Sequence, residues 1–465
     1  MACNETLNLR SPWPRVRIGD VAEIFDGPHA TPTKTATGPI FLGISALNRG
    51  RLDLSNTEHL SEEEFVKWTR RVTPKAGDVV FSYETRIGEA AIIPKGLRCC
   101  LGRRMGLVRT DSSKLDPHFF LYQYLGPAFQ DFLASRTIQG STVDRIALKE
   151  FPNFEIDLPP LAVQRQVAKV MADTDAKIDL SRRINQTLES MAQAIFKSWF
   201  VDFDPVKAKI TAIQEGRDPL RAAMSAISGK LEANLDSLPL EQYEQLIATA
   251  ALFPDEMNAS ALGEIPRAWA FQAANSLTEV GIGKTPPRKE PQWFTEGEGD
   301  WRWVSIKDMG ANGVFQQRSS EFLTSEAVSR FNVRVVPDRT VLLSFKLTIG
   351  RVAISDGPMV TNEAIAHFKL PNDAAISPEY LYLYLKGFDY STLGSTSSIA
   401  DAVNSKTIRE MPIILANRDL MDTFSKFVTP IFDEIRNRQN EIASLSATRD
   451  TLLPKLLSGE IEVPA

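Results

Sequence analysis

The feature that most constrains the fold is a long amphipathic segment, Leu158 to Phe203. Two prolines stand at its start, Pro159 and Pro160, and neither Pro nor Gly follows until Pro205. Its apolar residues recur in steps that are mostly three, four or their sums, the spacing of one stripe along a helix. A helix of about 40 residues far exceeds the globular mean of about 11–12. It therefore needs a partner of similar length to cover the stripe, which comprises Val167, Val170, Ile178, Ile184, Leu188, Met191 and Ile195.

An internal repeat supplies this partner. The segment FDEIRNRQNEIASL (432–445) aligns with TDAKIDLSRRINQTL (174–188), which pairs Ile178 with Ile435 and Leu188 with Leu445. We therefore expect a second helix from about Arg418 to Leu457. Its stripe comprises Phe424, Val428, Ile431, Ile435, Ile442, Leu445, Leu452 and Leu456.

The repeat extends to the globular segment that precedes each helix. VFSYETRIGEAAI (80–92) aligns with LLSFKLTIGRVAI (342–354), so that Ser82, Ile87, Gly88, Ala91 and Ile92 match Ser344, Ile349, Gly350, Ala353 and Ile354. Three further matches keep the same order along the chain: 13–21 with 269–277, TEHLSEEEF (57–65) with SEFLTSEAV (320–328), and PHFFLYQYL (117–125) with PEYLYLYL (378–385). Short β-prone runs (41–44, 78–82, 90–93 and 106–109) and an expected helix over 116–132 indicate a mixed α/β globule.

The predicted fold is α+β, with two mixed α/β globules joined by two long antiparallel helices that form a coiled coil. The helices would span roughly 60 Å at 1.5 Å per residue, or about 17–18 base pairs of B-DNA. A turn-rich segment between the halves reads as a linker, preceded by short helices. The expected boundaries are 1–157 for the first globule, 158–204 for the central helix, 205–266 for the linker with its short helices, 267–412 for the second globule and 413–465 for the C-terminal helix.

Composition places the chain among ordinary globular proteins. Its 465 residues allow roughly three domains, and 43% are hydrophobic and 24% charged. No apolar run approaches the roughly 18 residues that span a bilayer, and MACNETLNLRSPW does not resemble a signal peptide. The three cysteines, two of them adjacent, fit a reducing cytosol. We therefore expect a cytoplasmic protein, without a membrane partner or a metal site. The net charge of −5 requires any nucleic-acid surface to gather its positive charge by folding.

Motifs for catalysis are missing from the sequence. It has no GxxxxGK[ST] phosphate loop, no GxGxxG and no GxSxG elbow. Methyltransferases that act on base amines carry an acidic or Asn residue followed by two prolines and an aromatic. The nearest segment, Asp157 to Leu161, has an extra Leu and no aromatic. Glu-x-Lys, usual in metal-dependent nucleases, does not occur. We therefore expect no catalytic residues in this chain.

Binding chemistry remains, and it is duplicated. Each globule carries a serine, a polar loop and Ile-Gly, in SYETRIG (82–88) and SFKLTIG (344–350). These are either hairpin tips that contact phosphates or base edges or ordinary hairpins relaxed by a glycine. A basic cluster (Arg98, Arg103, Arg104 and Arg109) is either a nucleic-acid patch or the charged face of an edge strand. The candidate DNA-binding residues are Lys34, Arg86, Arg103, Arg104, Arg136, Ser141, Thr142, Lys284, Arg288, Lys346, Thr348, Ser395, Thr396 and Lys406.

LPPL (158–161) opens the long helical sequence described above. Together they resemble the central repeat region of the specificity subunits of type I restriction–modification systems. LGEIPRAW (262–269) resembles the start of the second target-recognition domain, and LLPKLLSGEI (452–461) the usual ending. ILANRDL (414–420) departs from the pattern, since the second helix start lacks LPPL. The resemblance covers essentially the whole chain.

This resemblance implies a function. The two globules would be target-recognition domains, each reading one half of a bipartite site in double-stranded DNA, and the helices would set the spacing. Two copies of a modification subunit would methylate adenine at N6 with S-adenosylmethionine. A restriction subunit would use ATP and Mg²⁺ to translocate and cleave, and the specificity chain would bind no cofactor. In this reading Val167, Ile178, Ile184, Leu188, Ile195, Phe424, Ile431, Ile435, Ile442 and Leu445 are packing positions of the spacer.

Two alternatives remain open at this point. One is a specificity chain of a modification-only or related phage-defence system, which would differ in its partner rather than its fold. The other is a coiled-coil scaffold that binds no DNA. The duplicated globules argue against a scaffold, because a scaffold needs only the helical rod.

Overall fold

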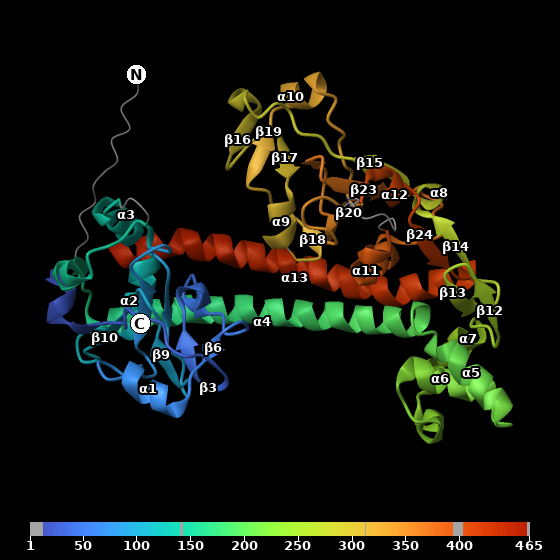
Figure 1. Cartoon of the computed structure of the whole chain (residues 1–465), viewed down its shortest axis with the longest axis horizontal. Coiled ribbons are helices and arrows are strands. Elements are labelled where there is room, and N and C mark those ends of the chain that lie inside the picture. The colour runs from blue at the N-terminus through green and yellow to red at the C-terminus, as the bar shows by residue number, and fades with distance from the viewer. Residues whose placement is uncertain (1–12, 140–142, 312, 394–402, 463–465) are drawn as a thin grey trace. The chain divides into compact units, whose positions relative to one another are not determined.

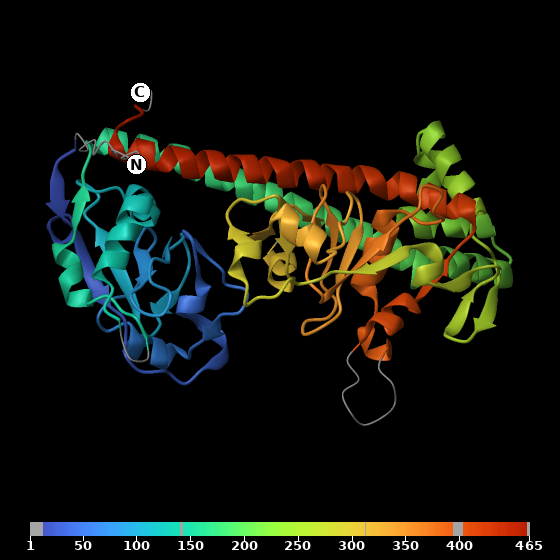
Figure 2. The same cartoon turned by 90° about the horizontal axis from the view of Figure 1, so that it is seen from above.

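A computed structural model of the chain describes residues 13–139, 143–311, 313–393 and 403–462. These residues form two compact units (Figures 1 and 2). Unit 1 runs to Leu180 and includes the chain from Ile442 onward, and unit 2 covers Ser181–Glu441. Each long helix therefore belongs partly to both units. No helix in the described part of the chain is long and apolar enough to cross a bilayer.

The long helices are α4, Leu161–Phe200, and α13, Arg418–Ser458. Both agree with the expected helices to within a few residues. In unit 1, Arg449 of α13 forms an ion pair with Asp175 of α4 at 2.8 Å. In unit 2, the Ser181 hydroxyl donates to Glu441 at 3.1 Å, and Asn185 donates to the carbonyl of residue 435 at 3.3 Å. As the residue numbers on α4 increase, those of their partners on α13 decrease. The two helices therefore pack antiparallel, as predicted.

The packing positions differ in their burial. Val167, Ile178, Phe424 and Ile435 are buried, whereas Ile184, Leu188, Ile195, Ile431, Ile442 and Leu445 are half-buried. The assignment of Met191 to the stripe was wrong, because its side chain is 50% exposed. The buried face passes through the neighbouring Ala192 instead. Near this end the helix turns aromatic residues inward, and the Phe196 ring lies 6.0 Å from that of Phe424.

Unit 1 combines a four-stranded sheet with smaller ones. The main order is β2-β10-β7-β8, beside β6-β3-β9, β1-β11 and β4-β5. Its other helices are α1 Glu62–Trp68, α2 Pro117–Leu125 and α3 Pro127–Arg136. The strands are β1 Arg15–Arg17, β2 Ala22–Asp26, β3 Thr35–Leu42, β4 Leu47–Asn48, β5 Arg51–Leu52, β6 Glu58–His59, β7 Val79–Ser82, β8 Ala90–Ile92, β9 Cys99–Leu101, β10 Met105–Thr110 and β11 Glu155–Asp157.

Unit 2 repeats this plan with additions. The sheet β15-β23-β20-β21-β18 lies beside β16-β19-β17-β22 and β14-β24. Its helices are α8 Ala274–Leu277, α9 Ile306–Ala311, α10 Ser325–Arg330, α11 Pro378–Gly387 and α12 Ser405–Arg409. Its strands are β14 Ala270–Ala273, β15 Glu279–Ile282, β16 Phe294–Glu296, β17 Trp301–Val304, β18 Phe315–Gln316, β19 Glu321–Leu323, β20 Val341–Ser344, β21 Val352–Ser355, β22 Val360–Thr361, β23 Ile365–Lys369 and β24 Pro412–Leu415.

The strand pairings match between the two units. In each sheet the third strand, β7 or β20, is antiparallel to both neighbours. The parallel pairs β3–β9 and β17–β22 also correspond. The side chains of Ser61 and Thr324, aligned in the sequence, both cap the following helix by accepting from a backbone N–H. The internal repeat therefore specifies one fold twice.

The helix expected over 116–132 was wrong in one respect, because the structure breaks it in two. Gly126 ends α2 and precedes α3 with extended backbone (φ −65°, ψ 147°). The next residue, Pro127, disfavours helical backbone at the residue before it. The ring then starts α3 at a position where a missing N–H costs nothing.

The segment 205–266, expected to be a linker with short helices, contains more regular secondary structure than that. It contains α5 Asp204–Gln214, α6 Pro219–Ser228 and α7 Leu240–Ala251, followed by an antiparallel hairpin of β12 Met257–Ser260 and β13 Gly263–Pro266. The short helices were expected, but the hairpin was not. The helices α6 and α7 share a small core formed by Ala223, Met224, Leu235 and Ala250.

Candidate nucleic-acid interface

The hairpin between β7 and β8 has a strained tip, which we call tip 1 (83–88). Thr85 adopts a φ of +65°, which is uncommon for a residue with a β-branched side chain. The Arg86 N–H donates to the Glu84 carbonyl at 2.7 Å, closing a three-residue γ-turn. The Ser82 hydroxyl donates to the same carbonyl at 2.5 Å. Gly88 then reverses the chain with a φ of +90°.

Tip 2 (345–350), between β20 and β21, repeats the backbone turn, although its serine hydroxyl bonds to a different carbonyl. Leu347 has a φ of +60° and Gly350 a φ of +88°. The Thr348 N–H donates to the Lys346 carbonyl at 2.7 Å, and the Ser344 hydroxyl donates to the Thr348 carbonyl at 2.6 Å. Strained backbone persists where the surrounding structure imposes it, often at functional sites. Its occurrence at both tips makes the two tips candidate contact sites.

The two tips differ in what they expose. In tip 1 the Arg86 guanidinium donates to the carbonyls of Ile44 and Ser45 at 3.2 and 3.3 Å. It also lies 3.4 Å from Glu89. These contacts hold Arg86 against its own unit.

The side chains of residues 346–349 of tip 2 are exposed, whereas Phe345 is buried. Leu347 is 99% exposed and Ile349 is 41% exposed. Lys346 and Thr348 are exposed as well, and the Lys346 amine lies 5.5 Å from the centre of the Phe345 ring. Tip 2 therefore presents a cation, a hydroxyl and a leucine together.

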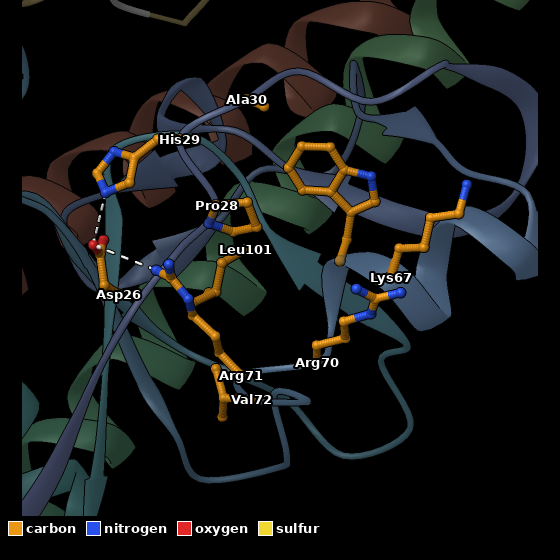
Figure 3. Close-up of a pocket in the computed structure, with 10 residues that line it drawn as sticks. Asp26, Pro28, His29, Ala30, Lys67, Arg70, Arg71, Val72 and Leu101 are labelled. Atoms are coloured by element: carbon orange, nitrogen blue, oxygen red, sulfur yellow. Dashed lines mark hydrogen bonds and ion pairs between the residues drawn. The ribbon is translucent and has the colours of Figure 1, made fainter.

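A hollow of about 410 Å³ lies in unit 1 between the loop after β2 and the end of α1 (Figure 3). We call it the basic pocket. Its cationic side chains come from Lys67, Arg70 and Arg71, and its lining is completed by Asp26, Pro28, His29, Ala30, Trp68, Val72 and Leu101.

Asp26 links the basic pocket to tip 1. Its carboxylate accepts hydrogen bonds from the His29 ring at 2.8 Å and from the Tyr83 hydroxyl at 2.9 Å. Arg71 lies 3.8 Å away on the other side (Figure 3). Burial and the neighbouring Asp26 raise the pKa of Tyr83 above its ordinary value, so the phenol remains a donor. The side chain of Tyr83 thus fixes the tip to the pocket wall.

Unit 2 has a related arrangement at the matching place, in the loop after β15 and at the end of α10. The Lys284 amine donates to the carbonyl of Phe331 at 2.6 Å. The Arg330 guanidinium lies 5.2 Å from the centre of the Trp293 ring. Arg334 approaches Glu279 at 4.0 Å. In both units, cations therefore gather where this helix ends.

Arg288 is held firmly in unit 2. Its guanidinium forms a two-pronged ion pair with Glu321, with N–O distances of 2.5 and 2.9 Å. It lies 4.1 Å from the centre of the Phe294 ring and 4.4 Å from that of Trp303. The ion pair raises its pKa above the usual value. This side chain organises the loop that carries Lys284.

The basic cluster expected around Arg98 is largely neutralised. Each of three arginines has a carboxylate partner: Arg98 with Glu62 at 2.9 Å, Arg104 with Glu84 at 2.6 Å and Arg109 with Asp78 at 2.7 Å. Only the fourth, Arg103, is exposed without such a partner among the residues that the structure describes. Arg103 is thus the member of the cluster whose charge stays available, and contact of the four arginines with nucleic acid stays a prediction.

The other candidate residues are spread over both units. Lys34 bonds to Glu58 in unit 1, and the exposed Arg136 lies 5.2 Å from the centre of the Phe132 ring. Lys406, in unit 2, lies 3.9 Å from Glu410. Four further candidates lie outside the described residues: Ser141, Thr142, Ser395 and Thr396.

Sequence reasoning missed the basic pocket. Arg70 and Arg71 are adjacent in the sequence and follow a short helix that ends in Lys67 and Trp68. That local signal was available, but the loop with Asp26 and its neighbours is distant in the sequence. Among the residues that the structure describes, no group of His, Cys, Asp or Glu side chains is suited to hold a metal ion.

Comparison with known proteins identifies a family and similar relatives. The family model for the type I restriction modification DNA specificity domain matches residues 10–190 and 266–443. The specificity subunit of the type I restriction enzyme HindI from Haemophilus influenzae is 33% identical over 70% of this chain and 72% of its own length. That of MjaIX from Methanocaldococcus jannaschii is 23% identical over 97% of this chain and 94% of its own length.

A solved structure shares the fold across nearly the whole chain. The S subunit of a type I restriction–modification system from M. genitalium superposes with a TM-score of 0.52 at 15% identity, covering 98% of this chain and 99% of that one. The chain thus belongs to the type I restriction–modification DNA specificity family. It is a specificity subunit, which confers DNA sequence specificity, and the scaffold alternative is disfavoured. Members of this family are in general non-catalytic.

Proposed function

We propose that each unit reads one half of a bipartite DNA site and that α4 and α13 set the distance between the halves. One observation carries the proposal: the same strained hairpin tip occurs in both units but exposes different side chains. The backbone at Thr85 and at Leu347 is alike, whereas only tip 2 extends a free cation and an apolar side chain. A repeated scaffold with different exposed groups suits the reading of two different sequences.

The exposed groups match the chemistry of base edges. In the major groove, lysine donates to guanine O6 and N7, hydroxyls bond to several bases, and apolar groups contact the thymine methyl. Lys346, Thr348 and Leu347 supply one of each. The arginines of the basic pocket suit phosphates, which fix position without reading sequence. Tip 2 would thus read bases, and the basic pocket would position the protein.

We infer the partners from the family, and the duplicated helices agree with them. Two identical modification subunits can dock on matching surfaces, because an internally repeated chain offers the same surface twice. S-adenosylmethionine would bind to these subunits, and ATP and Mg²⁺ to a restriction subunit. The specificity chain itself would supply sequence recognition and spacing.

A domain exchange tests the proposal. Residues 13–150 are replaced by the equivalent region of a relative, and methylated adenines are mapped across the genome of the host. We expect one half of the methylated sequence to change while the other half and the spacer stay constant. A change in both halves would contradict the assignment of one half to each unit. Equal methylation at unrelated sequences would contradict recognition altogether.

A further inference from the structure

The basic pocket carries more positive charge than its own carboxylates can neutralise. Arg70 is exposed and has no ion-pair partner among the described residues. The pairing of Arg71 with Asp26 is loose, with an N–O distance of 3.8 Å and the arginine side chain 64% exposed. Asp26 already accepts hydrogen bonds from His29 and Tyr83. A second anion would therefore find donors that the protein leaves unused.

The carboxylate of Glu64, on α1, is committed within its own helix. Glu64 accepts from the Lys67 amine at 2.6 Å and from the Trp68 indole at 2.8 Å. These hydrogen bonds lower the pKa of Glu64, the one from Lys67 most. Glu64 thus fixes the Trp68 ring and offers nothing to Arg70.

The shape of the pocket suits an extended anion rather than a small ion. Apolar groups of Pro28, Trp68, Val72 and Leu101 line it beside the cations. The volume of about 410 Å³ is ample for a phosphate with an adjoining sugar. Figure 3 shows the guanidinium groups of Arg70 and Arg71 directed to different sides, that of Arg71 toward Asp26 and that of Arg70 toward the side of Lys67. An extended backbone, rather than a single phosphate, would therefore contact both groups.

We propose that the basic pocket binds the phosphodiester backbone of the DNA through Arg70 and Arg71, and so positions unit 1 without selecting sequence. The inference rests on the proposed function, because it assigns a part of the same interface. Guanidinium groups donate to phosphate oxygens in two-pronged geometry. Since Tyr83 and Asp26 join the pocket to tip 1, a phosphate held by the arginines would fix where that tip meets the neighbouring groove.

The test measures the affinity of the full chain, assembled with its modification subunits, for two DNA duplexes over a range of salt concentrations. One duplex contains the mapped target and the other does not. The double variant Arg70→Gln with Arg71→Gln is compared with the unaltered chain and with Lys114→Gln. Lys114 is a matched exposed cation in unit 1, paired with Asp111 at 3.6 Å. It follows β10 at the end of the sheet away from Asp26, since Thr110 pairs with Ala22 there.

We expect the double variant to bind both duplexes more weakly by the same factor. Its plot of log affinity against log salt should be shallower by roughly 1–2 units, because each phosphate contact contributes about 0.9. Lys114→Gln should match the unaltered chain in slope and in preference. Circular dichroism and the melting temperature of the double variant should also match, because both arginines are exposed.

Three outcomes would overturn the inference. An unchanged slope would show that these arginines touch no phosphate. A loss confined to the target duplex would show that they read bases. An equal loss in Lys114→Gln would show a general charge effect. Failure of the unaltered complex to prefer the target would instead refute the proposed function, so the two failures are separable.

Discussion

Asp179 and Arg436 occupy equivalent positions of the internal repeat, each following one of the paired isoleucines, yet they carry opposite charges. On α4, Asp179 pairs with Arg51 of unit 1. On α13, Arg436 pairs with Asp356 and with Asp338 in unit 2. The same position therefore anchors each globule to its helix, and the polarity of the ion pair is reversed.

The first prediction concerns this anchor. Replacement of Arg436 by Ala should lower the free energy of unfolding by about 1–3 kcal/mol, because the largely buried carboxylate of Asp356 and the exposed one of Asp338 lose a shared donor. Lys426→Ala, at an exposed position of the same helix, is the control and should change stability by less than about 0.5 kcal/mol. Thermal and urea unfolding measure both. Equal losses in the two variants would refute the anchoring role.

A second prediction concerns the glycines that end the first strand of each main sheet, Gly27 and Gly283. A Cβ at Gly27 would lie 2.7 Å from the carbonyl oxygen of Gly102, and one at Gly283 would lie 2.1 Å from that of Asn362. Since backbone cannot yield easily, Gly27→Ala and Gly283→Ala should each destabilise by about 1–3 kcal/mol. Gly43→Ala, whose Cβ would meet only Ser45 at 3.6 Å, should fold normally. Melting temperatures that do not separate these variants would contradict the packing described.

The buried His367 leads to a prediction about pH. Burial lowers its pKa from the ordinary 6.5 to about 3, with Arg334 contributing further. The Nε2 atom bonds to the Thr361 hydroxyl at 2.5 Å. The unfolded chain takes up a proton below about pH 6.5 but the folded chain does not, so stability falls as pH drops from 6.5 toward 3.

Replacement of His367 by Gln should reduce this part of the pH dependence. The difference in melting temperature between pH 7.5 and pH 5 should be smaller than in the unaltered protein. His118→Gln, at an exposed position of α2, should leave the difference as it is in the unaltered protein. The same difference in melting temperature for all three proteins would contradict the assignment of this pH dependence to His367.

The helical spacer predicts a response to insertion. Seven residues added near Ile178 of α4, with seven added near Leu445 of α13, lengthen the pair by about 10 Å at 1.5 Å per residue. This corresponds to about three base pairs, so the gap between the methylated half-sites should lengthen accordingly or activity should be lost. Mapping of methylated adenines provides the measurement. Full activity with an unchanged gap would argue against the spacer.

Tip 2 gives the sharpest prediction about recognition. Lys346→Gln should alter base preference in one half-site only, with a change of about 1–3 kcal/mol at one position. The fold should be retained, because the side chain is exposed and makes no ion pair within the described residues. Leu347→Ser tests the apolar neighbour in the same way. An effect spread evenly over all sequences would assign Lys346 to phosphate contact instead.

Sequence reasoning was most successful where a pattern is periodic or repeated. The stripe through Ile178 and Ile435 predicted two long helices, and their ends agree with α4 and α13 within a few residues. Reasoning failed where a contact decides the outcome. Met191 fits the spacing but lies beside the buried line, and the single helix expected near Gly126 is two.

The sequence by itself determined the internal duplication, the pair of long helices and the family. Hydrophobic periodicity is visible within one segment, and an internal repeat is found by comparing the chain with itself. Tertiary structure alone decided which charges remain available. The sequence alone does not distinguish Arg98, Arg104 and Arg109 from Arg70. In the folded chain, however, each of these three pairs with a carboxylate. Arg70 and Arg71 become a candidate site only because the loop from Asp26 closes over the end of α1. Ion pairing and cavities depend on contacts between distant segments, and no local pattern encodes them.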